Sequence, residues 1–300
     1  MGFKSGFVCV VGLPNAGKST LINRILDSKL LAVSEKPQTT RNNILGIFTS
    51  KKAQVIFIDT PGYHNMEKAI NKFFVREAVN ATKKADVVVY LFDVKESISK
   101  KIAFNDEFIT EILKHKAKDK VIAVISKADT AKQANILKAE QELFTRYGFK
   151  PSELIKLSST LSLGVAQLML EVTKRLPEGP LYYPEDELTD RDLRFLCSEL
   201  IREKIFLLTK EEIPYSTAVQ ITKYEEKPDI HRIYADIYVE KDSQKGIIVG
   251  QKAAMIKNIG MEARKDIEKL VGCKVYLELF VKLKKDWTKD EQFLKELGYK

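Results

Sequence analysis

The feature that most restricts the fold of this chain is a glycine-rich segment near its start, Gly12-Leu-Pro-Asn-Ala-Gly-Lys-Ser19, which directly follows the apolar run Phe7–Val11. It matches the phosphate-binding loop G-x-x-x-x-G-K-[ST], in which a strand leads through a tight turn into a helix. The glycines let several backbone N–H groups point at one anion, and the helix expected from Ser19 adds the positive end of its dipole. The loop therefore predicts an α/β fold and a nucleoside triphosphate ligand.

The residues of this loop are predicted to surround the phosphates and to hold a metal ion. Lys18 is expected to reach the outer phosphates, where its charge also serves catalysis, and the Ser19 hydroxyl is expected to ligate Mg²⁺. A glycine turn that binds nothing is the competing interpretation, and the strand before and the helix after the loop disfavour it. The predicted nucleotide-binding residues here are Gly12, Leu13, Pro14, Asn15, Ala16, Gly17, Lys18, Ser19 and Thr20.

A second motif, Asp59-Thr-Pro-Gly62, follows the apolar strand expected at Val55–Ile58. The Asp59 carboxylate at the end of that strand can hold Mg²⁺ through a water molecule, and the Gly62 N–H can contact the γ-phosphate. Because a diphosphate lacks that group, the two nucleotide states are expected to differ at Gly62. Both residues are predicted to bind nucleotide.

A third segment, Gln38-Thr-Thr-Arg41, lies in a polar stretch between the first expected helix and the strand expected at Ile44–Phe48. Thr40 can cap the metal ion only while the γ-phosphate is present, which is the behaviour of a nucleotide switch. The predicted magnesium ligands are therefore Ser19, Thr40 and Asp59, and the predicted catalytic residues are Lys18, Thr40 and Gly62.

The choice of base is predicted from Ser126-Lys-Ala-Asp129, which follows the buried strand expected at Val121–Ile125. The Asp129 carboxylate can accept two hydrogen bonds from guanine, whereas adenine would leave this acceptor unpaired, so GTP is preferred over ATP. The stem of Lys127 can lie over the purine, and backbone after the strand Leu154–Leu157 can donate to the guanine carbonyl oxygen. The predicted base-binding residues are Ser126, Lys127, Asp129, Ser158, Ser159 and Thr160.

In this order and spacing the motifs resemble those of the Era family of bacterial GTPases, and the resemblance extends over nearly the whole chain. Its C-terminal part is the more specific. The segments that carry it there are Tyr183–Asp186, Thr189-Asp190, Ile201–Lys204, Glu211–Ser216, Val275–Lys282 and Asp286-Trp287. The resemblance implies a switch that hydrolyses GTP with Mg²⁺, binds small-subunit ribosomal RNA near its 3′ end and assists assembly of the small ribosomal subunit. It also implies a peripheral contact with the inner membrane.

Length and composition agree with a chain of about two domains. With 300 residues, 44% hydrophobic and 30% charged, it can bury sizeable cores. Cys9, Cys197 and Cys273 are too few and too scattered for a disulfide framework or a metal knuckle. No apolar run approaches the ~20 residues that span a bilayer. We expect a cytoplasmic monomer.

The net charge of +9 does not by itself indicate RNA binding. Residues 181–300 carry nearly equal numbers of acidic and basic side chains, so the excess of Lys and Arg lies in the first 180 residues. Local clusters of lysines are therefore the more useful guide to a nucleic-acid surface.

Short apolar strands alternate with amphipathic helices up to about Leu176, as in a mostly parallel sheet with helices on both faces. We expect a GTPase domain over residues 1–176, a linker over 177–190 and an α+β domain over 191–300. The second domain is expected to contain a helix (Asp192–Leu208), two strands (Ser216–Tyr224 and Ile230–Val239), two helices (Lys245–Val249 and Ala253–Val271) and a strand (Lys274–Lys284). That order is the one of a type II KH domain.

A KH domain holds single-stranded nucleic acid with a G-x-x-G loop between two helices, because missing side chains let the sugar-phosphate backbone approach. Here the loop reads Gly250-Gln-Lys-Ala253, so one methyl group intrudes. If Ala253 begins the next helix with negative φ, the methyl is tolerable and RNA binding is weakened rather than lost. The predicted RNA-binding residues are Lys245, Ile248, Gly250, Gln251, Lys252, Ala253 and Lys257. A place in the core is the competing interpretation for Ile248.

Three departures from the usual motifs bear on activity. Tyr63 stands where Ras-like enzymes have the glutamine that orients the attacking water, so slow hydrolysis is expected. Asn15 matches a potassium-coordinating asparagine of related GTPases, which makes K⁺ a candidate cofactor. Ser126 replaces the usual asparagine of N-K-x-D, and its shorter side chain supports the bound base less well.

Two alternative functions stay open. The first is an RNA-binding assembly chaperone with a decayed GTPase, and the second is a GTPase whose KH-like domain docks protein.

Overall fold

The computed structural model describes residues 2–34, 44–60, 78–94, 107–210 and 213–297 of the chain. The chain forms two compact units. The first comprises Met1–Ser28 and Asn43–Asp190, and the second comprises Lys29–Asn42 and Arg191–Lys300. The second unit therefore includes a short segment that follows the first helix. In sequence this segment is widely separated from the rest of that unit.

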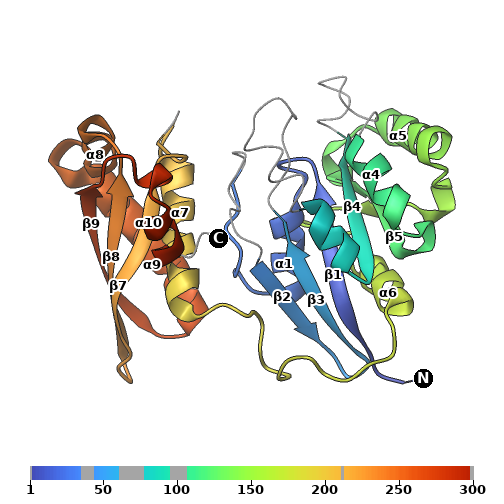
Figure 1. Ribbon diagram of the computed structural model, residues 1–300, viewed down its shortest axis with the longest axis horizontal. Coiled ribbons are helices and arrows are strands. Elements are labelled where there is room, and N and C mark those ends of the chain that lie inside the picture. Colours follow the sequence, from blue (N-terminus) through green and yellow to red (C-terminus); the bar gives the residue numbers. More distant parts are fainter. Residues whose placement is uncertain (1, 35–43, 61–77, 95–106, 211–212, 298–300) are drawn as a thin grey trace. The chain divides into compact units, whose positions relative to one another are not determined.

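The first unit is built on a six-stranded sheet with the strand order β2-β3-β1-β4-β5-β6 (Figure 1). β2 runs antiparallel to β3, and the other neighbouring strands are parallel. β1 and β4 are almost entirely buried, as parallel strands covered on both faces should be. The strands are Lys4–Gly12 (β1), Ile44–Thr49 (β2), Ala53–Asp59 (β3), Val87–Asp93 (β4), Val121–Ser126 (β5) and Ile155–Leu157 (β6).

Helices cover both faces of this sheet. α4 and α5 share a core cluster with β1, through residues such as Ile109, Leu143 and Cys9. α1 and α6 also contact β1 but lie outside that cluster, and their Leu21 and Leu168 are fully buried. The helices are Lys18–Leu26 (α1), Glu107–His115 (α4), Gln133–Tyr147 (α5) and Val165–Arg175 (α6), and residues 78–84 are also helical. The predicted fold class, a mostly parallel sheet between helices, is confirmed for this unit.

The second unit has the element order α7-β7-β8-α8-α9-β9 that was predicted. Its sheet has the order β7-β8-β9, with β7 antiparallel and β9 parallel to β8. Helix residues Leu200, Ile248 and Ile259 meet Ile233 and Ile237 of β8 in one core cluster. The elements are Leu193–Leu208 (α7), Ala218–Glu225 (β7), Ile230–Val239 (β8), Asp242–Val249 (α8), Ala254–Val271 (α9) and Lys274–Leu283 (β9).

Most predicted boundaries of the second unit lie within two residues of the observed ones, and two differences are larger. α8 begins at Asp242 instead of Lys245, because the Gln244 side chain accepts the backbone N–H of Lys241 at 3.0 Å and so caps an earlier first turn. A C-terminal helix, Glu291–Glu296 (α10), was not predicted. Its Phe293 packs with Trp287 on Ala218, in a small cluster separate from the main core.

Short 3₁₀ turns connect several elements, at Lys118–Lys120, Ala128–Thr130, Pro151–Glu153, Gln251–Ala253 and Trp287–Lys289. Across the described ranges, no helix is both long enough and apolar enough to cross a membrane.

Candidate functional site

The carboxyl ends of the strands bring most of the predicted nucleotide-binding segments to one edge of the first sheet. β1 ends at Gly12, β3 ends at Asp59 and β5 ends at Ser126. Ser126 lies opposite Asp93 of β4 and Leu157 of β6 in the parallel ladder. Ligands of open α/β sheets bind at this edge, so strand order and register alone align the predicted segments for one ligand.

The loop between β1 and α1 has the backbone conformation that its glycines were predicted to allow. Gly12 and Gly17 have φ of +152° and +96°, and Asn15 between them has φ of +64°. A Cβ atom at Gly12 would lie 2.6 Å from the carbonyl oxygen of Leu91, so that position excludes a side chain on space as well as on conformation. α1 begins at Lys18, one residue earlier than predicted.

Lys18, the first residue of α1, has a buried side chain that reaches back to the start of this loop. Its Nζ donates to the carbonyl oxygens of Gly12 and Leu13, each at 3.1 Å. Burial lowers the pKa of Lys18 to about 8, and the charge of Lys127 adds to the lowering, while Asp59 opposes it. A buried ammonium with two neutral partners gains from an incoming anion, so the geometry suits a phosphate ligand at Lys18.

Two of the predicted magnesium ligands, Ser19 and Asp59, are in contact. The Ser19 hydroxyl donates to Asp59 Oδ2 at 2.7 Å, and the Asp59 side chain is fully buried. A hydroxyl and a carboxylate this close form the hard oxygen set that Mg²⁺ prefers. Ile44, the first residue of β2, pairs with Asp59, so the chain enters β2 at the same edge.

Part of the predicted site lies outside the described residues. Thr40, Gly62 and Tyr63 belong to this part, and their predicted roles stay predictions. Asn15, the predicted potassium residue, is described and partly exposed in the loop, and its role toward K⁺ likewise stays a prediction.

The predicted base-binding motif follows β5 in a left-handed turn. Lys127 has φ of +54° and directly precedes the 3₁₀ turn Ala128–Thr130, in which the Asp129 side chain is exposed. Ser126 is 2% exposed, and its hydroxyl has no hydrogen-bond partner among the described residues. The short side chain of Ser126 therefore does not brace the turn in this structure.

A residue that was not predicted, Asp93, braces this turn instead. Its carboxylate, 2% exposed at the end of β4, forms an ion pair of 2.7 Å with Lys127 Nζ. Because Asp93 lies opposite Ser126 in the ladder, it stands next to the position where the usual asparagine is missing. The sequence could have indicated Asp93 as a site residue, because it ends an apolar run just as Asp59 does.

The third predicted base-binding segment is tied to α1. Arg24 donates from Nε to the Ser159 carbonyl oxygen at 2.9 Å and from Nη2 to the Thr160 carbonyl oxygen at 3.1 Å. The Ser158 hydroxyl lies 3.1 Å from that of Thr160 and accepts the Leu161 N–H at 3.2 Å. Arg24 was not predicted, and no motif signals it, because its partners are distant in sequence.

In the second unit, the loop between α8 and α9 contradicts the conformation assumed for Ala253. Ala253 has φ of +60° and Lys252 has φ of +48°, so both lie in the left-handed region, and α9 begins only at Ala254. The Ala253 N–H donates to the Gly250 carbonyl oxygen at 3.2 Å, which closes the loop. Ala253 is thus the residue that precedes α9, at the position where the motif has its second glycine, and glycine adopts positive φ without the strain that a Cβ atom adds.

One predicted RNA-binding residue is wrongly assigned. Ile248 is fully buried in the core of the second unit, so the alternative of a core residue holds for it. Lys245, Gln251, Lys252 and Lys257 have exposed side chains around the loop. These four side chains remain available to a phosphate backbone, whereas that of Ile248 does not.

Known protein families match both units of this chain. The 50S ribosome-binding GTPase family matches residues 7–127, and the KH domain family matches residues 212–288. The chain is 46% identical to GTPase Era of Geobacter metallireducens over 99% of this chain and 98% of that protein. It is 44% identical to GTPase Era of Thermotoga maritima, over 100% of this chain and 99% of that protein.

Two solved structures resemble the whole chain. The Y63A variant of Aquifex aeolicus Era bound to GDP·AlF4⁻ superposes with a TM-score of 0.87 at 35% identity, over 99% of both chains. Era in complex with MgGDPNP and nucleotides 1506–1542 of 16S ribosomal RNA superposes with a TM-score of 0.87 at 34% identity, over 99% of both chains. This chain therefore belongs to the Era family of GTPases and is a GTP hydrolase with a C-terminal KH domain.

Proposed function

We propose that this chain is a GTP-dependent switch that binds small-subunit ribosomal RNA near its 3′ end and assists assembly of the small ribosomal subunit. The observation that carries this proposal is the presence, on one chain, of a phosphate loop with Ser19 and Asp59 in contact and of a closed KH loop at Gly250–Ala253. The Era structure bound to MgGDPNP and a 16S ribosomal RNA fragment, similar over 99% of this chain, supports the same pairing of ligands.

In the nucleotide site we keep the roles predicted from the sequence, which for Thr40 and Gly62 rest on the sequence alone. Lys18 binds the outer phosphates, Ser19 and Asp59 hold Mg²⁺ together with Thr40, and Gly62 senses the γ-phosphate. Mg²⁺, when bound, neutralises charge that develops on the transferred phosphoryl group. The other proposed nucleotide-binding residues are Gly12, Leu13, Pro14, Asn15, Ala16, Gly17, Thr20, Ser126, Lys127, Asp129, Ser158, Ser159 and Thr160.

In the RNA site the exposed residues Lys245, Gln251, Lys252 and Lys257 contact phosphates, and the backbone at Gly250 lets the RNA approach. Within this proposal residues 1–176 form the GTPase domain and residues 191–300 the RNA-binding domain, joined by 177–190. The same proposal includes K⁺ binding at Asn15. It also includes a monomeric protein that is located in the cytoplasm and makes a peripheral contact with the inner membrane.

Two measurements on the full-length protein test the proposed function. Multiple-turnover hydrolysis of GTP, compared in K⁺ and Na⁺, separates a working switch from an RNA chaperone with a decayed GTPase. Asp129→Asn should shift the preference from GTP to xanthosine triphosphate, because the amide replaces one of the two carboxylate acceptors by a donor. An unchanged preference for GTP would contradict the assignment of the base-binding residue.

RNA binding is tested by titrating a labelled RNA of nucleotides 1506–1542 of 16S ribosomal RNA at fixed salt, because phosphate contacts depend on salt. We expect Lys252→Met to weaken binding several-fold, whereas Lys265→Met, which removes an exposed charge on the body of α9, should not. Equal binding by both variants and the parent chain would favour a KH-like domain that docks protein.

A further inference from the structure

Arg24 links two segments of the first unit that were predicted to bind opposite ends of the nucleotide. It lies in the last turn of α1, the helix that begins at Lys18 of the phosphate loop. Its Nε donates to the Ser159 carbonyl oxygen at 2.9 Å, and its Nη2 donates to the Thr160 carbonyl oxygen at 3.1 Å. At a rise of 1.5 Å per residue, Arg24 lies about 9 Å from Lys18 along the helix axis. The helix that begins at the phosphate loop therefore also holds the base segment, residues 158–160.

The turn after β6, which contains the base segment, is not held by packing of its side chains. Residues 160–163 are exposed, and among them Leu161 and Leu163 are 69% and 54% exposed. The turn closes through the Ser158 N–H, which donates to the Leu163 carbonyl oxygen at 3.0 Å. Because its side chains bury little surface, polar contacts decide how the turn lies against α1, and Arg24 supplies two of them.

The contact uses the planar shape of the guanidinium group. Nε–H and one Nη–H of a guanidinium lie side by side in one plane, so they can meet two neighbouring carbonyl oxygens at once. The ammonium of a lysine carries its donors on one rotating atom, so it cannot fix two peptide groups in one orientation. Arg24 therefore orients two consecutive peptide bonds, where a lysine would hold one.

Fixing these carbonyl groups also orients the N–H groups of the same peptide bonds. In a planar trans peptide the C=O and the following N–H point in opposite directions, so the Thr160 N–H points away from Arg24. The next N–H, that of Leu161, donates to the Ser158 hydroxyl at 3.2 Å. Within the part of the chain that the structure describes, the N–H groups of Ser159 and Thr160 have no hydrogen-bond partner. Both are therefore available to a ligand.

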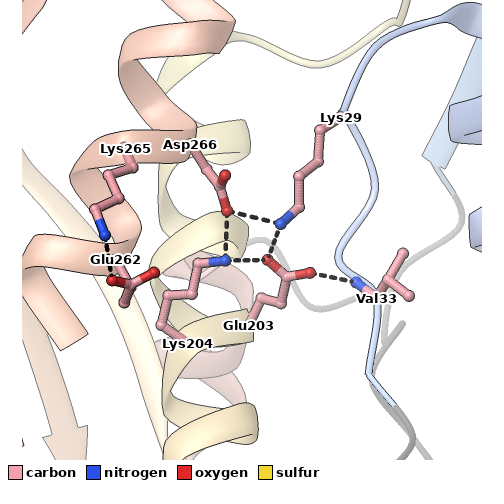
Figure 2. Close-up of polar contacts among 7 residues, drawn as sticks. All are labelled: Lys29, Val33, Glu203, Lys204, Glu262, Lys265 and Asp266. Carbon is pink, nitrogen blue, oxygen red and sulfur yellow. Dashed lines mark hydrogen bonds and ion pairs between the residues drawn. The ribbon is translucent and has the colours of Figure 1, made fainter. Parts of the chain in front are cut away.

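The two other basic side chains in and just after α1 are engaged elsewhere. Lys18 donates to two carbonyl oxygens at the start of the phosphate loop. Lys29, three residues after the end of α1, lies with its Nζ 2.9 Å from Glu203 Oε2 and 2.7 Å from Asp266 Oδ2 (Figure 2). Neither lysine can take over the contact that Arg24 makes with the base segment.

We infer that Arg24 is a positioning residue for base recognition, which holds the backbone N–H groups of the base segment where the oxygen at C6 of guanine meets them. This inference rests on the proposed function, because it presupposes guanine in the site. Asp129 reads another edge of the same base, through N1–H and the exocyclic amine. The N–H groups that Arg24 positions select for an acceptor at C6, where adenine has a donor.

The test measures the dissociation constants of the full-length protein for GDP, 6-thio-GDP and inosine diphosphate, by competition with a fluorescent guanine nucleotide. Sulfur at C6 is a weak acceptor, so the parent chain should bind GDP about fivefold more tightly than 6-thio-GDP, a factor that one hydrogen bond can supply. In Arg24→Met the GDP constant should rise several-fold, and this preference should fall below about twofold. Inosine diphosphate keeps the oxygen and lacks only the amine, so the preference for GDP over it should not change.

Two further variants separate positioning from a general loss of stability. Arg24→Lys should recover part of the preference for oxygen over sulfur, because an ammonium can still donate to one of the two carbonyl oxygens. The matched control is Arg175, the last residue of α6, whose Nε donates to the Asp119 carbonyl oxygen at 2.8 Å. Asp119 precedes β5, whereas the predicted ligand segments follow the strands, so Arg175→Met should change neither preference.

An equal loss of affinity for all three nucleotides in Arg24→Met is the signature of a purely structural role and would overturn the inference. Hydrogen exchange of the Ser159 and Thr160 amides checks it in the parent chain. Saturating GDP should slow this exchange by about tenfold or more, and saturating 6-thio-GDP should slow it less. Equal slowing by the two nucleotides would overturn the inference and leave the proposed function intact, whereas a parent chain without affinity for GDP would refute the proposed function itself.

Discussion

Replacing Ala253 by glycine should stabilise the second unit, although glycine usually destabilises a folded chain. Ala253 has φ of +60° and ψ of 24°, and a residue with a Cβ atom pays about 1–2 kcal/mol for this left-handed conformation. Glycine adopts it without steric strain but loses about 0.5–1 kcal/mol more conformational entropy on folding. The net effect of Ala253→Gly is therefore a gain of roughly 0.5–1 kcal/mol.

The next residue supplies a control of opposite sign. Ala254 has φ of −66° and ψ of −39° and is the first residue of α9, so Ala254→Gly should cost roughly 0.5–1 kcal/mol. The two variants have the same amino-acid composition, and each removes one alanine methyl group, at neighbouring positions. Any difference between them must come from the backbone conformation of the parent residue.

The single tryptophan makes the assay specific for the second unit. Trp287 is 1% exposed and packs on Phe293, so its fluorescence follows the unfolding of that unit. With a urea m-value of about 2 kcal/mol/M, the midpoint should rise by roughly a quarter to half molar in Ala253→Gly and fall by a similar amount in Ala254→Gly. A lower midpoint in both variants would refute the assigned conformation of Ala253.

Further predictions concern the base-binding turn, acid stability and thiol reactivity. Asp93→Asn and Lys127→Met should each weaken GDP binding in calorimetric titrations. The double variant should bind GDP no more weakly than Lys127→Met, because Asp93 acts through that lysine. Additive losses of GDP affinity in the double variant would contradict this role of Asp93. Burial alone would raise the pKa of Asp266, but hydrogen bonds from two lysines outweigh it and lower that pKa below its ordinary 3.8. Its contribution to stability is therefore complete above about pH 4 and is lost as the pH falls further, so the urea midpoints of the parent chain and of Asp266→Asn should converge in acid. Burial, with the charge of a nearby aspartate, raises the pKa of Cys197 to about 12, so iodoacetamide at pH 8 should label the native protein at Cys273 and not at Cys197, as peptide mass spectrometry would show.

Local sequence was sufficient where a motif needs particular backbone conformations or chemical groups within a few residues. Gly12 and Gly17 have the positive φ that the loop pattern requires, and Asp59 ends a strand as its apolar run predicted. The alternation of apolar strands and helices was likewise sufficient to predict the sheet with helices on both faces. In each case the relevant neighbours lie close in sequence, so the pattern carries the physical constraint directly.

Short apolar runs were less informative. Ile248 lies in a run that is too short to show which face of α8 points inward, so its burial became clear only from the packing of α7, α9 and β8 around it. Ala253 was similar, because alanine is a good helix former and its sequence favours negative φ. In the folded chain Ala253 instead lies between the turn that starts at Gly250 and the first residue of α9, and there it has positive φ.

What the sequence by itself determined is the set of predicted ligand loops, their order and the two kinds of sheet that carry them. What only the tertiary structure decided is which distant charges meet. Asp93 reaches Lys127 because adjacent parallel strands place their carboxyl ends side by side, and Lys29 reaches Asp266, 237 residues away, because the segment after α1 folds into the second unit. Such pairs have no local pattern, since an ion pair needs only proximity and burial, and both are properties of the folded chain.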